Sequence, residues 1–181
     1  MTSLRGTLLV AAPWLEDPNF ERTVVLVSEH GDDGAMGVVL NRPSPVTVAE
    51  AAPALRPAVD ENHQIWLGGP VQPAAVVFLA EFSEPSLSAL MVFGRVGFPS
   101  SDAAIEDLAD ATGRTRVFAG YAGWGPGQLE DELERGDWMM EPAVPDDVFC
   151  SEPFALWSAV LERKGGRFRL IASMPPDPSL N

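Results

Sequence analysis

The sequence predicts an α+β fold, with one domain built on a mixed, largely antiparallel sheet that helices flank. Short runs of β-branched and apolar residues outnumber the helical segments and follow one another along the chain, unlike a regular alternation of strand and helix. The 16 glycines and 17 prolines divide the 181 residues into short elements. With 46% hydrophobic and 21% charged residues and no linker, we expect one core and a single domain over residues 1–181.

The N-terminal region is expected to form strands and one hairpin. The β-branched run at residues 23–27 is typical of a strand, and residues 31–34 form a short Gly/Asp connection typical of a hairpin. Pro43 and Pro45 predict a turn over residues 41–45, because two prolines are not expected to continue a sheet. The strands expected here cover residues 6–12, 22–29 and 36–40.

A short helix is expected after this turn. Thr47 and Glu50 have the spacing of a capping box, in which the two residues hydrogen-bond each other's backbone N–H groups. The helix should reach about Ala52, because Pro53 cannot continue it. Apolar runs then predict strands at residues 64–67, 74–81, the second half of 87–96, and 115–121.

Serine and glycine mark the expected limits of a helix over residues 102–111. Ser100 or Ser101 is expected to cap its N-terminus, and Gly113 is expected to follow its end. Apolar residues recur there at helical spacing, so one face of this helix should be buried.

Two more helices are expected in the C-terminal half. Gly125 and Pro126 fit the N-cap and first position of a helix that reaches about Arg135 and ends at Gly136. Pro153 opens the other helix, and two consecutive glycines mark its end. Strands are expected at residues 138–140 and 168–172, with residues 172–181 as an extended tail.

The charge balance argues against direct nucleic-acid binding. The chain has 26 Asp and Glu residues against 12 Lys and Arg, a net charge of −14 at pH 7. Nucleic-acid affinity rests mainly on Lys and Arg contacts to phosphate. The densest basic group either complements the negative end of a helix dipole, the favoured interpretation, or contacts phosphate. It consists of Arg163, Lys164, Arg167 and Arg169.

We expect a cytoplasmic protein without cofactor, metal or membrane partner. Cys150 is the only cysteine, so no disulfide can form within the chain and a cysteine-based metal site lacks partners. No apolar run reaches the roughly 18–20 residues that cross a bilayer. We interpret Cys150 as a small core or rim residue rather than a nucleophile.

The most distinctive stretch covers residues 120–133, where four glycines, two aromatic residues and a proline precede an acidic helical segment. A strand, glycines and a helix N-terminus are typical of a phosphate-binding turn. The glycine spacing matches no nucleotide motif, and acidic residues in the first helical turns would oppose a phosphate. The favoured interpretations are a tight structural corner packed under Trp124 and a binding surface built on Tyr121, Trp124 and Gln128.

Two other loops offer polar or flexible residues. Asn41 and Arg42 follow a predicted strand and either hydrogen-bond their own turn or present donors to a ligand carboxylate. Gly68 and Gly69 mark a sharp exit from another strand. We predict that these loops converge on one face that binds a protein partner or a small ligand. The predicted residues are Asn41, Arg42, Gly68, Gly69, Tyr121, Trp124 and Gln128.

An enzyme is the alternative. The sequence has no nucleophile elbow. His30 precedes Asp32 and Asp33, but no second histidine follows at a metal-binding spacing, so a structural turn is the favoured interpretation. Catalysis would therefore need a carboxylate-centred or His30-centred site with a shifted pKa.

Four segments, in order, resemble the bacterial YqgE/AlgH family, and the resemblance covers essentially the whole chain. It implies a small cytosolic single-domain protein in which helices flank a sheet, and it implies no catalytic residues. Members are labelled uncharacterised or transcriptional regulators. Direct DNA contact fits this acidic chain poorly, so we expect regulation through a bound protein or ligand. The segments are residues 6–13 with 17–24, 34–43, 67–71 and 120–133.

Overall fold

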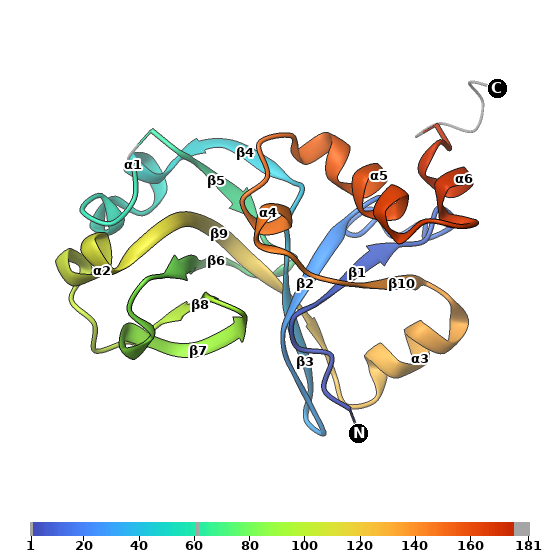
Figure 1. Ribbon diagram of the computed structural model, residues 1–181, viewed down its shortest axis with the longest axis horizontal. Coiled ribbons are helices and arrows are strands. Elements are labelled where there is room, and N and C mark those ends of the chain that lie inside the picture. The colour runs from blue at the N-terminus through green and yellow to red at the C-terminus, as the bar shows by residue number, and fades with distance from the viewer. Residues whose placement is uncertain (1, 61, 176–181) are drawn as a thin grey trace.

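A curled sheet of ten strands organises the described part of the chain, residues 2–60 and 62–175 of the computed structural model (Figure 1). Its longest strand, β9 (Thr112–Trp124), pairs antiparallel with β6 (Val71–Phe82) and β3 (Gly34–Val39), and parallel with β5 (Gln64–Leu67). The other pairings recorded among these residues are antiparallel. The predicted α+β class with a mixed, largely antiparallel sheet is confirmed.

One half of the sheet has the strand order β10-β1-β2-β3. Hydrogen bonds join β1 (Thr7–Ala11) to β2 (Val24–Gly31) on one side and to β10 (Trp138–Pro142) on the other. The last residue pair between β2 and β3 is Gly31 opposite Gly34, next to the turn that joins the two strands. The predicted hairpin is therefore confirmed.

The other half continues from β9 through β6 to β8 (Val96–Pro99) and β7 (Ser88–Phe93). It also contains β4 (Pro43–Thr47), which pairs with β5. The predicted turn over residues 41–45 is therefore wrong from Pro43 onward. The sheet tolerates both prolines because β4 pairs only with β5, and an edge strand can lack some N–H donors.

Helices cover the sheet and connect its strands. The capping box predicted at Thr47 is present: Oε2 of Glu50 accepts the backbone N–H of Thr47 at 2.9 Å. The α-helices of the described residues are α1 (Val48–Ala51), α2 (Ile105–Ala111), α3 (Gln128–Arg135), α4 (Pro145–Val148), α5 (Pro153–Lys164) and α6 (Phe168–Ala172), with 3-10 turns η1 (Pro53–Leu55) and η2 (Pro85–Leu87).

Two helices begin later than predicted. The N-cap of α2 is Ala104, not Ser100 or Ser101, and the predicted stop Gly113 already lies in β9. The N-cap of α3 is Gly127, whose φ of 75° only glycine adopts readily. The Gly125 carbonyl instead accepts the N–H of Gln128 in a turn before the helix.

The predicted final strand at residues 168–172 is wrong, because this segment is helix α6. Its apolar residues Phe168, Ile171 and Ala172 have the spacing of one helical face and pack into the main core beside α5. Ala172 is thus helical rather than the start of an extended tail. Residues 176–181 of the predicted tail lie outside the described residues.

The sheet is buried on both faces. Leu8 and Val10 of β1 point into the largest cluster, under α5 and α6, while Leu9 and Ala11 point into a second cluster with α3. Figure 1 shows α5 and α6 on one side of β1 and β10, and α3 on the other. A third cluster lies under α1 and α2. Among the described residues, no helix combines the length and apolar character needed to cross a bilayer.

Candidate functional site

Three segments that are far apart in the sequence, the loops after β3 and β5 and the middle of β9, meet at one junction of the sheet. The backbone N–H of Val39 donates to the carbonyl of Gly68 (2.8 Å), and the N–H of Gly68 donates to the carbonyl of Ala119 (2.9 Å). The N–H of Leu67 donates to the carbonyl of Arg42 (2.8 Å). The ends of β3 and β5 are thereby joined to the middle of β9. We call this region the three-loop junction.

Close backbone contact at the three-loop junction requires glycine. A Cβ atom on Gly69 would lie 2.3 Å from the carbonyl carbon of Tyr121, and one on Gly120 would lie 2.5 Å from the carbonyl oxygen of Gly69. Their φ angles, 151° and 71°, are also unfavourable for other residues. The glycines at this point serve the tight packing of a structural corner.

Asn41 and Arg42 hold the preceding loop against the three-loop junction. Asn41 is buried, accepts the N–H of Val24 at 3.0 Å and donates to the carbonyl of Arg22 at 2.9 Å. Nη2 of Arg42 donates to the carbonyls of Pro18 (3.0 Å) and Glu21 (3.2 Å). Burial lowers the pKa of Arg42, partly offset by Glu21 and Asp17. Both residues therefore use hydrogen-bonding groups structurally.

A cavity of about 230 Å³ opens at the three-loop junction, and we call it the junction groove. Arg42, Gly69 and Ala119 line it together with Leu67, whose side chain is 48% exposed. Gly68 is hydrogen-bonded to Val39 and Ala119, Tyr121 lies against the backbone of Gly69, and Asn41 precedes Arg42 in the chain. Of the seven predicted site residues, the junction thus brings together Asn41, Arg42, Gly68, Gly69 and Tyr121.

Trp124 and Gln128 lie away from the junction groove. Trp124 is only 6% exposed and packs against Phe20 and Trp138 in the second core cluster, so the expected aromatic surface at this position is wrong. Its indole Nε1–H donates to Oε2 of Glu132 at 2.8 Å, which satisfies the polar atom of the buried ring. Trp138 donates to the same oxygen at 2.8 Å.

The acidic first turns of α3 are occupied by contacts within the protein. Gln128 accepts the N–H of Gly125 at 3.0 Å and donates to Oε1 of Glu132 at 2.9 Å. Oε1 of Glu130 accepts a hydrogen bond from His30 at 2.8 Å. These side chains stabilise the corner between β9 and α3, and they leave negative charge where a phosphate would have to approach.

His30 is a buried residue with both ring nitrogens engaged. Its side chain is 2% exposed. Nδ1 accepts the N–H of Leu4 at 3.2 Å, which places the proton of the neutral ring on Nε2, facing Glu130. The pKa of Glu130 is lowered first by a hydrogen bond from its own backbone N–H and then by the bond from His30. Across residues 2–60 and 62–175, no cluster of His, Cys, Asp and Glu has a metal-binding arrangement.

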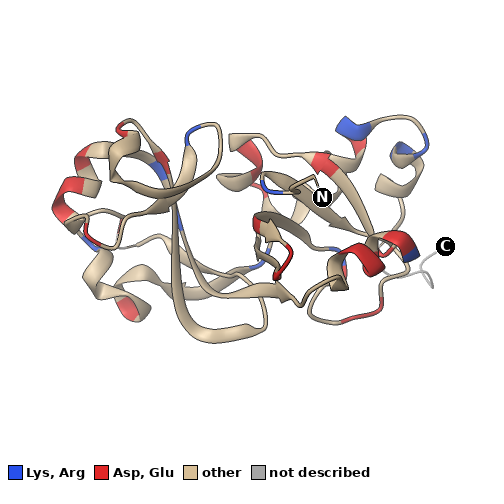
Figure 2. Ribbon diagram, turned by 90° about the horizontal axis from the view of Figure 1, so that it is seen from below, with Lys and Arg blue, Asp and Glu red and all other residues tan. Residues whose placement is uncertain are grey.

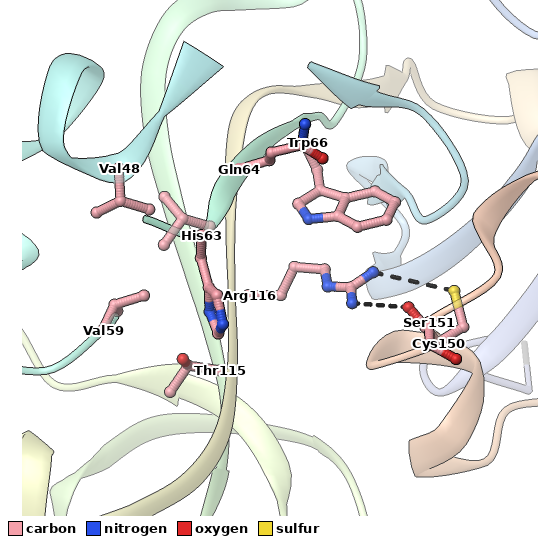
Figure 3. Close-up of a pocket in the computed structure, with 10 residues that line it drawn as sticks. Val48, Val59, His63, Gln64, Trp66, Thr115, Arg116, Cys150 and Ser151 are labelled. Carbon is pink, nitrogen blue, oxygen red and sulfur yellow. Dashed lines mark hydrogen bonds between the residues drawn. The ribbon is translucent and has the colours of Figure 1, made fainter. Parts of the chain in front are cut away.

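A second cavity, also about 230 Å³, lies beside Arg116 of β9 and was not predicted from the sequence (Figure 3). The guanidinium carbon of Arg116 lies 3.8 Å from the ring centroid of Trp66, a cation–π distance. Nη2 of Arg116 donates to the carbonyl of Cys150 at 2.9 Å, and Nη1 lies 3.9 Å from Sγ. We call this cavity the Arg116 pocket.

Only the fold brings the parts of the Arg116 pocket together. Arg116 is hydrogen-bonded to a residue 34 positions later in the sequence, so no local motif predicts the contact. The alternation of Arg114 and Arg116 on one strand was a weak signal for two cations on one face. Arg114 is neutralised by Glu81 (2.9 Å) and Asp146 (2.7 Å).

Two residues of the basic C-terminal group, Arg163 and Lys164, form ion pairs. Nη1 of Arg163 lies 2.7 Å from Oδ1 of the buried Asp147, and Nζ of Lys164 lies 3.4 Å from Oε2 of Glu141. Figure 2 shows acidic residues on both halves of the molecule, with the basic residues dispersed among them. This pattern favours the helix-end interpretation of the basic group.

Comparisons with known proteins agree with this architecture. A family model described as AlgH-like matches residues 8–169. A UPF0301 protein of Streptomyces coelicolor is 45% identical over 187 residues, covering 100% of this chain and 97% of the relative.

Two solved structures share the fold. A crystal structure of a Corynebacterium diphtheriae protein has a TM-score of 0.86 at 31% identity, covering 96% of this chain and 93% of that one. The solution structure of the AlgH protein from Pseudomonas aeruginosa has a TM-score of 0.74 at 34% identity, covering 96% and 95%. The chain belongs to the AlgH-like family.

Proposed function

We propose that this AlgH-like protein is a cytoplasmic regulatory protein that acts by binding an apolar segment of a protein partner in the junction groove. The observation that carries the proposal is the convergence of three distant segments, two loops and the middle of β9, around the half-exposed Leu67. Pro70 and Pro73 also line the groove, so much of its lining is apolar.

Backbone strain beside the junction groove supports this proposal. The non-glycine residues with positive φ in the described ranges are Arg22 (51°) and Gln72 (44°). Gln72 lies between the two prolines of the groove wall, and the carbonyl of Arg22 is held by Asn41. Strained backbone persists only where its surroundings enforce it, and it is enriched at functional sites.

The residues that line the groove indicate which side chain of a partner would bind there. Val39 and Ala119 also line it, so an apolar side chain fits better than a charged one. Complete burial of a leucine side chain is worth about 1.5–3 kcal/mol. Arg42 at the rim carries further N–H donors that suit carbonyl or carboxylate groups of the partner's backbone or side chains.

Regulation through direct DNA contact is not part of the proposal. Arg163 and Lys164 are paired with carboxylates, and the chain carries a net charge of −14. A protein partner agrees with these charges, because protein interfaces need no phosphate-neutralising surface.

Site-specific photo-crosslinking in cells tests the proposal. A photoreactive phenylalanine at position 67 should capture a defined protein, and the same residue at position 170 should not. Leu170 is a suitable control because it is 75% exposed and lies on α6. The captured partner is then purified and titrated against Leu67→Asp and Leu170→Asp.

We expect Leu67→Asp to weaken the partner's affinity at least tenfold and Leu170→Asp to leave it unchanged. Capture at both positions alike, or equal affinity of the two variants, would contradict docking in the junction groove.

A further inference from the structure

The Arg116 guanidinium is enclosed by groups that do not neutralise it. Its contacts are the Trp66 ring, the Cys150 carbonyl and the Cys150 sulfur. Burial raises the pKa of the Cys150 thiol, which keeps the sulfur uncharged at neutral pH. Within the described residues, no carboxylate forms an ion pair with Arg116, whereas Arg114 on the same strand has two carboxylate partners.

A half-buried cation without a counter-ion has lost hydration that its neighbours only partly replace. Desolvation is the largest influence on the pKa of Arg116 and lowers it. Removing charge from water is costly unless an opposite charge compensates. An anion that enters the Arg116 pocket would supply that compensation, and in a partly desolvated site the attraction is stronger than in water.

The Arg116 pocket has further groups that suit a ligand. Ser151 and Cys150 lie on the guanidinium side, while His63 and Thr115 lie beside the stem of Arg116 (Figure 3). The Ser151 and Thr115 hydroxyls can donate hydrogen bonds to oxygen. Such a combination of a cavity, a charged group and a few polar groups is typical of a small-molecule site.

The composition of the pocket selects one class of anion. It contains a single arginine as its permanent cation, so it matches one negative charge better than the two of a phosphate. Val48, Val59 and Val117 provide an apolar wall. We propose that the Arg116 pocket binds a small monocarboxylate with a short apolar tail, at a site separate from the junction groove.

Nuclear magnetic resonance titration tests this assignment with butyrate as the probe. We expect saturable shifts of the Trp66 indole and Arg116 side-chain N–H signals in the wild-type protein. Butanol, the uncharged analogue, should cause no such shifts. Inorganic phosphate serves as the competing anion, and saturable shifts with phosphate in place of butyrate would overturn the monocarboxylate assignment.

Two substitutions on the same strand separate the effect of the site from general electrostatics. Arg116→Gln should weaken butyrate binding at least tenfold, and Arg114→Gln, which removes an equal charge two residues away, should not change it. If Arg116→Gln fails to fold, Ser151→Phe at the exposed rim should block the pocket and abolish the butyrate shifts. Butyrate binding that survives Arg116→Gln or Ser151→Phe, or that is absent from the wild type, overturns the proposal whatever the result at the junction groove.

Discussion

The imidazole of His30 donates a hydrogen bond to the carboxylate of Glu130 at 2.8 Å and thereby joins residues 100 positions apart. The second ring nitrogen accepts the backbone N–H of Leu4. One buried ring thus connects the N-terminal segment, the β2–β3 hairpin and α3. His30 therefore lies near the end of β2 as a buried structural residue rather than in the predicted turn.

The His30–Glu130 contact predicts a pH-dependent contribution to stability. The pKa of Glu130 is lowered on folding, so its carboxylate stabilises the native state above the ordinary value of 4.5, and this contribution is lost as the pH falls through the lowered pKa. Denaturant unfolding should show Glu130→Gln less stable than wild type at neutral pH, with the difference shrinking as the pH falls below 4.5. Asp131→Asn, in the same helical turn, is the control and should show a smaller pH dependence.

Replacing Glu132 is expected to lower the stability of the protein more than replacing Glu130, through contacts that do not involve His30. Its Oε2 accepts the indole N–H groups of both Trp124 and Trp138. Glu132→Ala would leave two indole donors without a partner, at a cost of about 1–3 kcal/mol for each donor that stays buried. Chemical denaturation followed by tryptophan fluorescence measures the loss. The exposed Glu134 on the same helix provides the control variant Glu134→Ala, and equal stability of the two variants would refute the role of Glu132.

The three-loop junction has no room for a side chain at position 69. In Gly69→Ala the new methyl group would lie 2.3 Å from the backbone of Tyr121, so strands must separate. We expect a loss of more than about 2 kcal/mol in the free energy of unfolding, or failure to fold. Gly113→Ala is the matched change, because its nearest contact would be at 3.8 Å. A fully stable Gly69→Ala protein would show that the junction can relax.

The ion pair between the buried Asp147 carboxylate and the exposed Arg163 is expected to stabilise the fold. It accepts two hydrogen bonds from Arg163 (2.7 and 2.9 Å) and one from the N–H of Val144 (2.9 Å). Asp147→Asn removes the charge and weakens these hydrogen bonds, and because Arg163 is exposed to solvent we expect a cost of about 1–3 kcal/mol. Asp146→Asn next to it should cost less than about 1 kcal/mol, since the Asp146 side chain is 87% exposed. Thermal and urea unfolding measure the stability of both variants. A loss in Asp146→Asn equal to or greater than that in Asp147→Asn would contradict the prediction.

Local sequence signals predicted the fold well where a few neighbouring residues decide the structure. The Gly31–Gly34 hairpin, the Thr47–Glu50 capping box and the Gly136 helix stop all depend on contacts within a few residues. The errors arise where packing against residues distant in the sequence determines the secondary structure. Pro43 is accepted in β4 only because that strand lies at an edge, and the segment at residues 168–172 forms a helix because α5 offers it an apolar face.

For the candidate site, too, the features set by neighbouring residues could be predicted, and those set by distant contacts could not. Backbone requirements at Gly68 and Gly69 could be predicted, because glycine clusters imply close approach or unusual φ angles. The exposure of Trp124 could not, since a tryptophan in a glycine-rich corner suits either a surface or a core. Its burial depends on Glu132 and Phe20, which the local pattern does not link to it. Arg116 was missed because its hydrogen-bond partner, Cys150, lies in a separate segment.

The length of β9 has a consequence for how the molecule opens. Residues 112–121 of this strand pair with β6, and residues 122–124 pair with β3, so one continuous backbone belongs to both halves of the sheet. Neither half can detach as an independent unit without disturbing this strand. The amide protons at the middle of β9 should therefore exchange with solvent only when the whole domain unfolds, and the protein should lose its structure in one cooperative step.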